Sequence, residues 1–232
     1  DIGVTPNVSL SYSPDPGRIV YARIATAYRP GGLNTDDGVT GRYASDRVRA
    51  MDLGGRMRLL DGRLGIDGNL FLTRWSDIQS DYLRPEGWIG TRNAGHASIV
   101  GLDASVDWQA AEGWRIAAGG VAQRRRRREG PSRYLPLVPD LSARLAVSRA
   151  QTLGGWQVVP RLSVELTGAT HLGLDGPADR RMPPRVIGRF GVVGHSHQLT
   201  LALDLDNLTG VRADTLAFGN PFAATTARYY TP

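Results

Sequence analysis

LTLALDLD, residues 199–206, places a leucine at every second position and a small or polar residue between them. A period of two is typical of a β-strand with one apolar face, because successive side chains point to opposite sides. The same alternation recurs in residues 20–28, 51–59 and 100–108. The sequence therefore predicts an all-β fold built from many strands, each with one apolar face.

The composition agrees with strands and turns. Of 232 residues, 41% are hydrophobic and 22% charged, which excludes a disordered chain, and the 29 glycines and 14 prolines favour many turns. Cysteine is absent, so disulfides and thiolate metal sites are excluded. No window approaches the roughly 18 apolar residues of a membrane-spanning helix, whereas a barrel strand needs only about 9 to 11 residues.

The connections between the predicted strands alternate strictly between short and long. Tight turns fall at residues 15–18, 60–63, 110–113, 153–156 and 194–198, and long loops at residues 30–45, 80–95, 126–139, 171–184 and 209–225. In an antiparallel up-and-down meander, this order gathers all tight turns at one rim and all long loops at the other. Short turns opposite long loops are typical of transmembrane β-barrels in outer membranes.

The predicted wall has ten strands, and residues 227–230 have the pattern of an eleventh that has just begun. Ten open strands leave two unpaired edges, and each unsatisfied backbone group in a membrane costs several kcal/mol. We therefore expect a partial barrel that needs further strands for closure. Asp1 follows no export signal within the chain, so we also expect residues upstream of it.

Five strings resemble, in the same order, the carboxy-terminal barrel of TonB-dependent receptors, over nearly the whole chain. They are YARIATAYRPGGLN (residues 21–34), ASDRVRAMDLGGRMRLLDGRLGIDGNLFLTRWSDIQ (44–79), NAGHASIVGLDASVDW (93–108), LDLDNLTG (203–210) and YYTP (229–232). Asp52 stands where that family usually has an acidic residue, and YYTP is similar to the approach to its last strand.

The resemblance implies that residues 1–232 are the carboxy-terminal part of a 22-strand barrel in the outer membrane of a Gram-negative bacterium. It further implies that the plug, the TonB-contacting box and the final strand are missing from this chain. The implied function is active uptake of a scarce ligand, driven through the TonB complex, with a ferric siderophore as the expected cargo. Cobalamin, haem, nickel and oligosaccharides remain open as cargo.

Two groups of residues are candidate binding sites. We expect Arg23, Arg29, Asp52, Arg56 and Arg58 to point into the lumen, chiefly in structural charge pairs. An arginine and aromatic mixture suits an anionic, partly aromatic iron chelate. The residues expected to contact such a ligand are Arg29, Asn34, Asp36, Asp37, Tyr82, Arg84 and Trp88.

The net charge of +6 comes entirely from arginine, and residues 124–128 form a run of five. Arg124, Arg125, Arg126, Arg127 and Arg128 sit where a strand rises into a long loop, so we expect them at a solvated rim facing lipopolysaccharide phosphates. Without a recognition module, nucleic-acid binding is not expected.

Catalytic and metal sites are not predicted. His195 and His197 share one side of a strand but lack a nearby carboxylate or thiolate, and His96 and His171 are expected at the polar surface. Ser196 lies between two histidines without an orienting acid, so we expect neither an enzyme nor a bound cofactor.

Two other functions fit parts of the pattern. A smaller, self-closing porin-like barrel would show the same alternation and conduct solutes by diffusion. A soluble β-sandwich, such as a carbohydrate-binding module, would also alternate, but around a dry interior between two layers.

Overall fold

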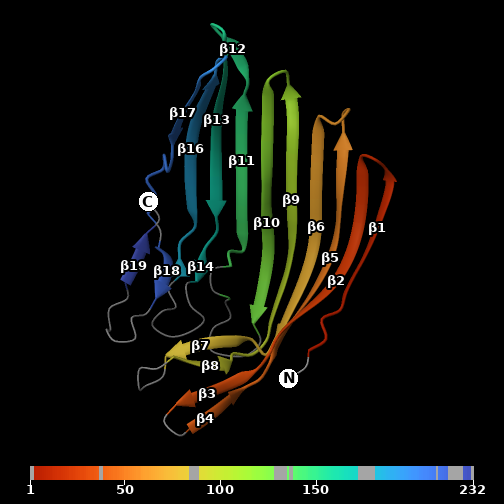
Figure 1. Cartoon of the computed structure of the whole chain (residues 1–232), viewed down its shortest axis with the longest axis vertical. Coiled ribbons are helices and arrows are strands. Elements are labelled where there is room, and N and C mark those ends of the chain that lie inside the picture. The colour runs from red at the N-terminus through yellow and green to blue at the C-terminus, as the bar shows by residue number, and fades with distance from the viewer. Residues whose placement is uncertain are drawn as a thin grey trace.

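The computed structural model describes residues 3–36, 39–83, 89–127, 135, 138–171, 181–212, 214–218 and 227–230. Its main feature is an 11-stranded antiparallel sheet that curves as a single layer (Figure 1). Along the sheet, neighbours follow chain order: β1 (Asn7–Asp15), β2 (Arg18–Arg29), β5 (Asp46–Leu59), β6 (Leu64–Ser76), β9 (Ala97–Ala111), β10 (Trp114–Arg127), β11 (Leu141–Arg149), β13 (Trp156–Thr167), β16 (Arg185–His195) and β17 (Thr200–Leu205). The eleventh strand, β12 (Gln151–Leu153), pairs with β13.

The predicted up-and-down meander is confirmed. All tight turns lie at one end of the sheet, and the long connections extend from the other end (Figure 1). Three long connections contain small hairpins of their own: β3 (Gly32–Asp36) with β4 (Val39–Tyr43), β7 (Gln79–Leu83) with β8 (Ile89–Asn93), and β14 (Thr170–His171) with β15 (Arg181–Met182). A fourth hairpin, β18 (Asp214–Phe218) with β19 (Ala227–Tyr230), follows the last wall strand β17. The strand expected at residues 227–230 exists, but it pairs with β18 and not with the main sheet.

The tight turns fall at the positions that the sequence predicted. At the turn between β5 and β6, Asp61 and Gly62 have φ of 53° and 84°, a left-handed conformation that favours glycine and aspartate. The turn between β1 and β2 works differently, because Gly17 has no positive φ and its amide instead donates to the Asp15 carboxylate at 2.9 Å. The β5–β6 turn reverses the chain over residues 60–63, and the β1–β2 turn over residues 16 and 17.

Strand register divides the sheet into an apolar face and a polar face. Ala22, Leu53, Leu70, Leu102, Ala122 and Leu141 lie opposite one another across six neighbouring strands. Ile24, Met51, Leu72 and Val100 form the next apolar row. Between these two rows, Arg23, Asp52, Phe71, Gly101 and Gln123 form a row that points to the opposite face.

The apolar face is not covered by a second layer within the described part of the chain. Leu53 is 60% exposed and Leu203 is 58% exposed, while the buried hydrophobic residues among those described are Ile78, Ala97, Leu135, Ala146 and Met182. A soluble sandwich would bury this face against another sheet. Among the described residues, no helix has the length and hydrophobicity needed to cross a membrane.

Candidate functional site

Two hairpins in the long connections are joined to each other by one asparagine. The Asn34 side chain on β3 donates to the Thr91 carbonyl at 2.7 Å and accepts from the Thr91 amide at 2.8 Å. Its amide group therefore pairs with β8 much as a neighbouring strand's backbone would. The hairpins β3–β4 and β7–β8 lie together at the end of the sheet opposite the tight turns (Figure 1).

Asn93 and Gln79 attach these hairpins to the sheet below. Asn93 accepts from the Ala44 amide at 2.7 Å and donates to the carbonyls of Ala44 and Asp77 at 3.0 and 2.7 Å. The Gln79 side chain donates to the carbonyls of Pro30 and Ala44 at 2.8 and 3.0 Å. Because backbone groups outside the main sheet need partners, these two side chains fix the path of both loops.

A buried carboxylate lies at the base of the hairpins. Asp46, the first residue of β5 and beyond the apolar rows, is only 4% exposed. It accepts from Arg29 at 2.5 and 3.3 Å, from the Trp75 indole at 3.1 Å and from the Gln79 amide at 3.3 Å. Burial opposes ionisation, but the hydrogen bonds from Arg29, the Gln79 amide and Trp75 outweigh it, so the Asp46 pKa lies below its usual range.

Of the seven residues expected to contact a ligand, four lie among the described residues. Arg29 and Asn34 take part in the contacts just described. Asp36 and Tyr82 lie on the strands β3 and β7 of the two joined hairpins. Asp37, Arg84 and Trp88 lie outside the described residues.

Sequence reasoning assigned no role to Asp46, Gln79 or Asn93, although all three fall within the quoted family-like strings. Asp46 begins the wall strand β5, whereas Gln79 and Asn93 lie on the hairpin strands β7 and β8, so the three residues share no position in the alternation of the wall. Their partners lie 16 to 50 residues away, so only the folded arrangement shows what they hold.

Of the five residues expected in charge pairs on the polar face, two form them with carboxylates: Arg29 pairs with Asp46 and Arg56 with Asp67. Two others contact neutral side chains, because Arg23 donates to Asn7 at 3.3 Å and Asn69 donates to Asp52 at 3.2 Å. Further along the sheet, Arg115 pairs with Asp107 at 2.5 Å, and Arg189 with Glu165 and Asp206 at 2.8 and 3.1 Å. These exposed pairs add little stability, but they keep this face hydrophilic.

The arginine run divides between the two faces because the strand has a period of two. Arg124 and Arg126 are exposed on the apolar face, in register with Val100 and Ser98. Arg125 lies 3.5 Å from Asp140, and Arg127, 6% exposed, donates to the Ala94 carbonyl at 3.0 and 2.8 Å. Arg128 lies outside the described residues.

The histidines have ordinary polar contacts. His96 Nδ1 accepts from the Asp77 amide at 3.2 Å, and His195 Nδ1 lies 2.9 Å from the Thr200 hydroxyl. No cluster of three or more potential metal ligands occurs in the described ranges.

The family model for the TonB dependent receptor-like β-barrel matches residues 3–208. The chain belongs to this TonB-dependent receptor family. A curated relative is the pesticin receptor of Yersinia enterocolitica, which is 26% identical over 218 residues. That match covers 88% of this chain and 31% of the receptor, so the chain spans about a third of its relative's length.

Solved structures of uptake receptors and a transporter share the fold. The ferric yersiniabactin uptake receptor FyuA from Yersinia pestis superimposes with a TM-score of 0.79 at 22% identity, over 98% of this chain and 35% of FyuA. The copper transporter OprC gives a TM-score of 0.72 at 13% identity, over 98% of this chain and 37% of OprC. At these identities, the likeness establishes the architecture and not the cargo.

Membership in the TonB-dependent receptor family orients the sheet. The chain belongs to the outer membrane of a Gram-negative cell, with its apolar face toward lipid and its polar face toward the lumen. Tight turns lie on the periplasmic side in such barrels, and long loops lie outside. The joined hairpins β3–β4 and β7–β8 are therefore extracellular.

Proposed function

We propose that this chain is part of an outer-membrane receptor that takes up a ferric siderophore, with energy supplied by the TonB complex. The main support is the pair of extracellular hairpins, which Asn34, Gln79 and Asn93 fix in one arrangement at the mouth of a polar lumen. A preorganised surface binds a ligand with a smaller loss of conformational entropy than separate mobile loops would. The yersiniabactin receptor FyuA, which shares the fold, supports a ferric chelate as cargo.

We assign ligand contact to the ends of the two hairpins. Arg29 and Asn34 already hold the wall and the hairpins together, so their contribution to binding is positional. Asp36, Asp37, Tyr82, Arg84 and Trp88 are the remaining candidates. Arginine and aromatic side chains suit an anionic, partly aromatic chelate, through charge-assisted hydrogen bonds and cation–π contact.

We also propose that the complete wall is a 22-strand barrel, closed around a plug that lies outside these 232 residues. Two observations support this. The main sheet is an open path that ends at β1 and β17, and the chain covers only 31% of the pesticin receptor. Contact with the TonB complex would then pass through the plug and its box, and not through the strands described above.

Uptake of radioactive iron tests this function. The full-length receptor, expressed in cells that lack their own siderophore receptors, is offered ⁵⁵Fe chelated by catecholate, hydroxamate or phenolate siderophores. We expect TonB-dependent uptake of one chelate class. Replacement of Arg84 and Trp88 by alanine should weaken binding by roughly tenfold or more, since arginine and tryptophan dominate such contacts.

Arg115→Ala is the matched control, because Arg115 lies at the periplasmic end of the polar face. Its binding constant should equal that of the unaltered receptor. Uptake that continues without TonB, together with general permeability to small sugars, would instead support a diffusion channel. Binding that is unchanged by the Arg84 and Trp88 substitutions would overturn the assignment of ligand contact to the hairpin ends.

A further inference from the structure

Strand register collects five arginines from three strands at the extracellular end of the apolar face. Arg49 on β5 lies opposite Arg74 on β6, and the same row continues through Ser98 to Arg126 on β10. Arg47 lies on β5 in the adjacent row toward the hairpins, and Arg124 lies on β10 in the adjacent row toward the membrane. We call Arg47, Arg49, Arg74, Arg124 and Arg126 the arginine belt.

The arginine belt has no counter-charge within the described part of the chain. All five side chains are exposed, and none makes an ion pair or a hydrogen bond with a described residue. Arg56, Arg115 and Arg189 on the polar face, by contrast, each pair with a carboxylate. Because like charges directly opposite each other destabilise a sheet, the pair of Arg49 and Arg74 favours a nearby anion, which the described residues do not supply.

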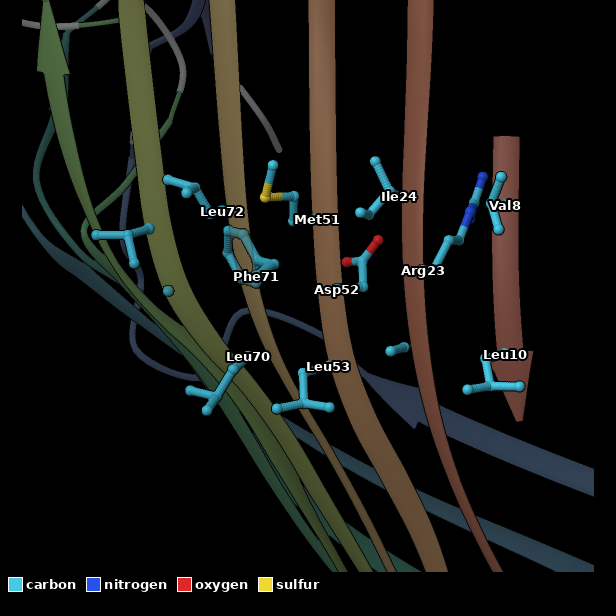
Figure 2. Close-up of a pocket in the computed structure, with 13 residues that line it drawn as sticks. Val8, Leu10, Arg23, Ile24, Met51, Asp52, Leu53, Leu70, Phe71 and Leu72 are labelled. Carbon is cyan, nitrogen blue, oxygen red and sulfur yellow. The ribbon is translucent and has the colours of Figure 1, made fainter. Parts of the chain in front are cut away.

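An apolar depression continues the surface directly below the belt. Figure 2 shows Ile24, Met51, Leu53, Leu70 and Leu72 lining it from neighbouring strands, and Val8, Leu10 and Val100 complete the apolar lining. Met51 and Leu72 are two residues from Arg49 and Arg74 on the same strands and the same face, a step of roughly 7 Å. Arg124 shares a row with Met51, Leu72 and Val100, so the charged and apolar surfaces meet without a gap.

We propose that this surface binds a phosphorylated, acylated lipid of the outer leaflet, of the lipopolysaccharide type. Its phosphates would contact Arg49, Arg74 and Arg126, whose planar guanidinium groups can each donate two parallel hydrogen bonds to a phosphate. Its acyl chains would occupy the depression. The sequence predicted contact with lipid phosphates for all of residues 124–128. The arginine belt keeps only Arg124 and Arg126 of that run and adds Arg47, Arg49 and Arg74 from other strands.

The combination of surfaces favours a lipid over a free anion. Inorganic phosphate could bind the arginine belt but would make no contact with the apolar depression. A phosphorylated lipid could contact both surfaces at once. The belt also lies at the extracellular end, which in an outer membrane faces the leaflet of phosphorylated glycolipid. The proposal needs only the orientation of the barrel and is independent of which ligand the receptor imports.

The test measures lipid binding by the purified full-length receptor in detergent, with native mass spectrometry as the readout. The probes are bisphosphorylated lipid A, the same lipid A after removal of its phosphates, and inorganic phosphate as a competitor. The main variant is R49Q/R74Q, and a second variant on another strand, R124Q/R126Q, protects against a local folding defect. The control is R149Q, because Arg149 is exposed at the opposite, periplasmic end of the same face, where it lies over Trp114.

We expect the unaltered receptor and R149Q to retain bisphosphorylated lipid A equally. Each double variant should bind it roughly tenfold more weakly or worse, since each arginine near an anionic headgroup adds measurably to affinity. Removal of the phosphates from the lipid should weaken binding to the unaltered receptor by a similar factor. The proposal is overturned if both double variants bind like the unaltered receptor, if the dephosphorylated lipid binds equally well, or if millimolar phosphate alone displaces the lipid.

Discussion

Asp46 and Arg29 form an ion pair in which the two partners have very different surroundings. The Arg29 side chain is 54% exposed, so water replaces its partner easily when the pair is broken. The Asp46 side chain is 5% exposed and also accepts hydrogen bonds from the Trp75 indole and the Gln79 amide. The carboxylate is therefore the buried centre of the group at the base of the extracellular hairpins, and Arg29 supplies its counter-charge and also donates to the Gln79 carbonyl at 3.1 Å.

Both alanine substitutions should therefore be costly. Asp46→Ala leaves two donors without an acceptor and should lower the free energy of unfolding by about 2–4 kcal/mol. Arg29→Ala leaves a buried carboxylate without its counter-charge and should lower it by about 3–5 kcal/mol. Urea unfolding of the full-length receptor in lipid vesicles, followed by tryptophan fluorescence, measures both values. A loss below about 1 kcal/mol for Arg29→Ala would contradict the role of Arg29 as the counter-charge of Asp46.

At the scale of a strand, β9 shows how a period of two separates the two environments. Ala104 and Ser105 are consecutive, similar in size and both exposed, yet they lie on opposite faces. Ala104 lies opposite Gly68 and Gly120 on the apolar face, and Ser105 opposite Asp67 and Gly119 on the polar face. The two residues therefore differ in environment, because Ala104 faces the hydrocarbon of the bilayer and Ser105 faces the aqueous lumen.

Arginine introduced at each position tests this assignment. Ala104→Arg should lower the free energy of unfolding in vesicles by about 2–4 kcal/mol, the cost of a charge near the middle of the bilayer. Ser105→Arg should change it by less than about 1 kcal/mol, because the side chain enters the lumen near Asp67. A larger loss for Ser105→Arg than for Ala104→Arg would reverse the orientation of the sheet.

For the whole molecule, the decisive feature is that the sheet ends in two strands that each have one partner. β1 pairs only with β2, and β17 pairs only with β16, within the described residues. An unpaired backbone group in hydrocarbon costs several kcal/mol, so neither edge is stable in a bilayer without a further strand. The self-closing porin-like alternative requires β1 and β17 to pair, and the structure does not show that pairing.

Residues 1–232 expressed and exported alone should therefore not yield a closed monomeric barrel. We expect no folded band with heat-modifiable migration in gel electrophoresis, and aggregated material in its place. The full-length receptor prepared in parallel is the control and should give that band. A heat-modifiable monomer of residues 1–232 that conducts ions across a planar bilayer would support the diffusion barrel instead.

The sequence alone determined the strands, the positions of the tight turns and the assignment of side chains to two faces. These features are local, because the alternation of side chains and the turn residues, such as Asp61 and Gly62, act over a few positions. For the same reason, the inward direction of Arg56 and Asp52 was predictable from their apolar neighbours.

Only the tertiary structure decided which distant residues meet. Asn34 with Thr91, Asp46 with Trp75, and Arg49 with Arg74 and Arg126 are brought together by strand register and by the packing of loops. Strand alternation predicts the face of the sheet on which a side chain lies. It does not predict the residue opposite it on the next strand, because that depends on how far neighbouring strands are shifted along one another. The run at residues 124–128 therefore had a predictable location, whereas the belt to which Arg124 and Arg126 belong appears only when the strands are placed side by side.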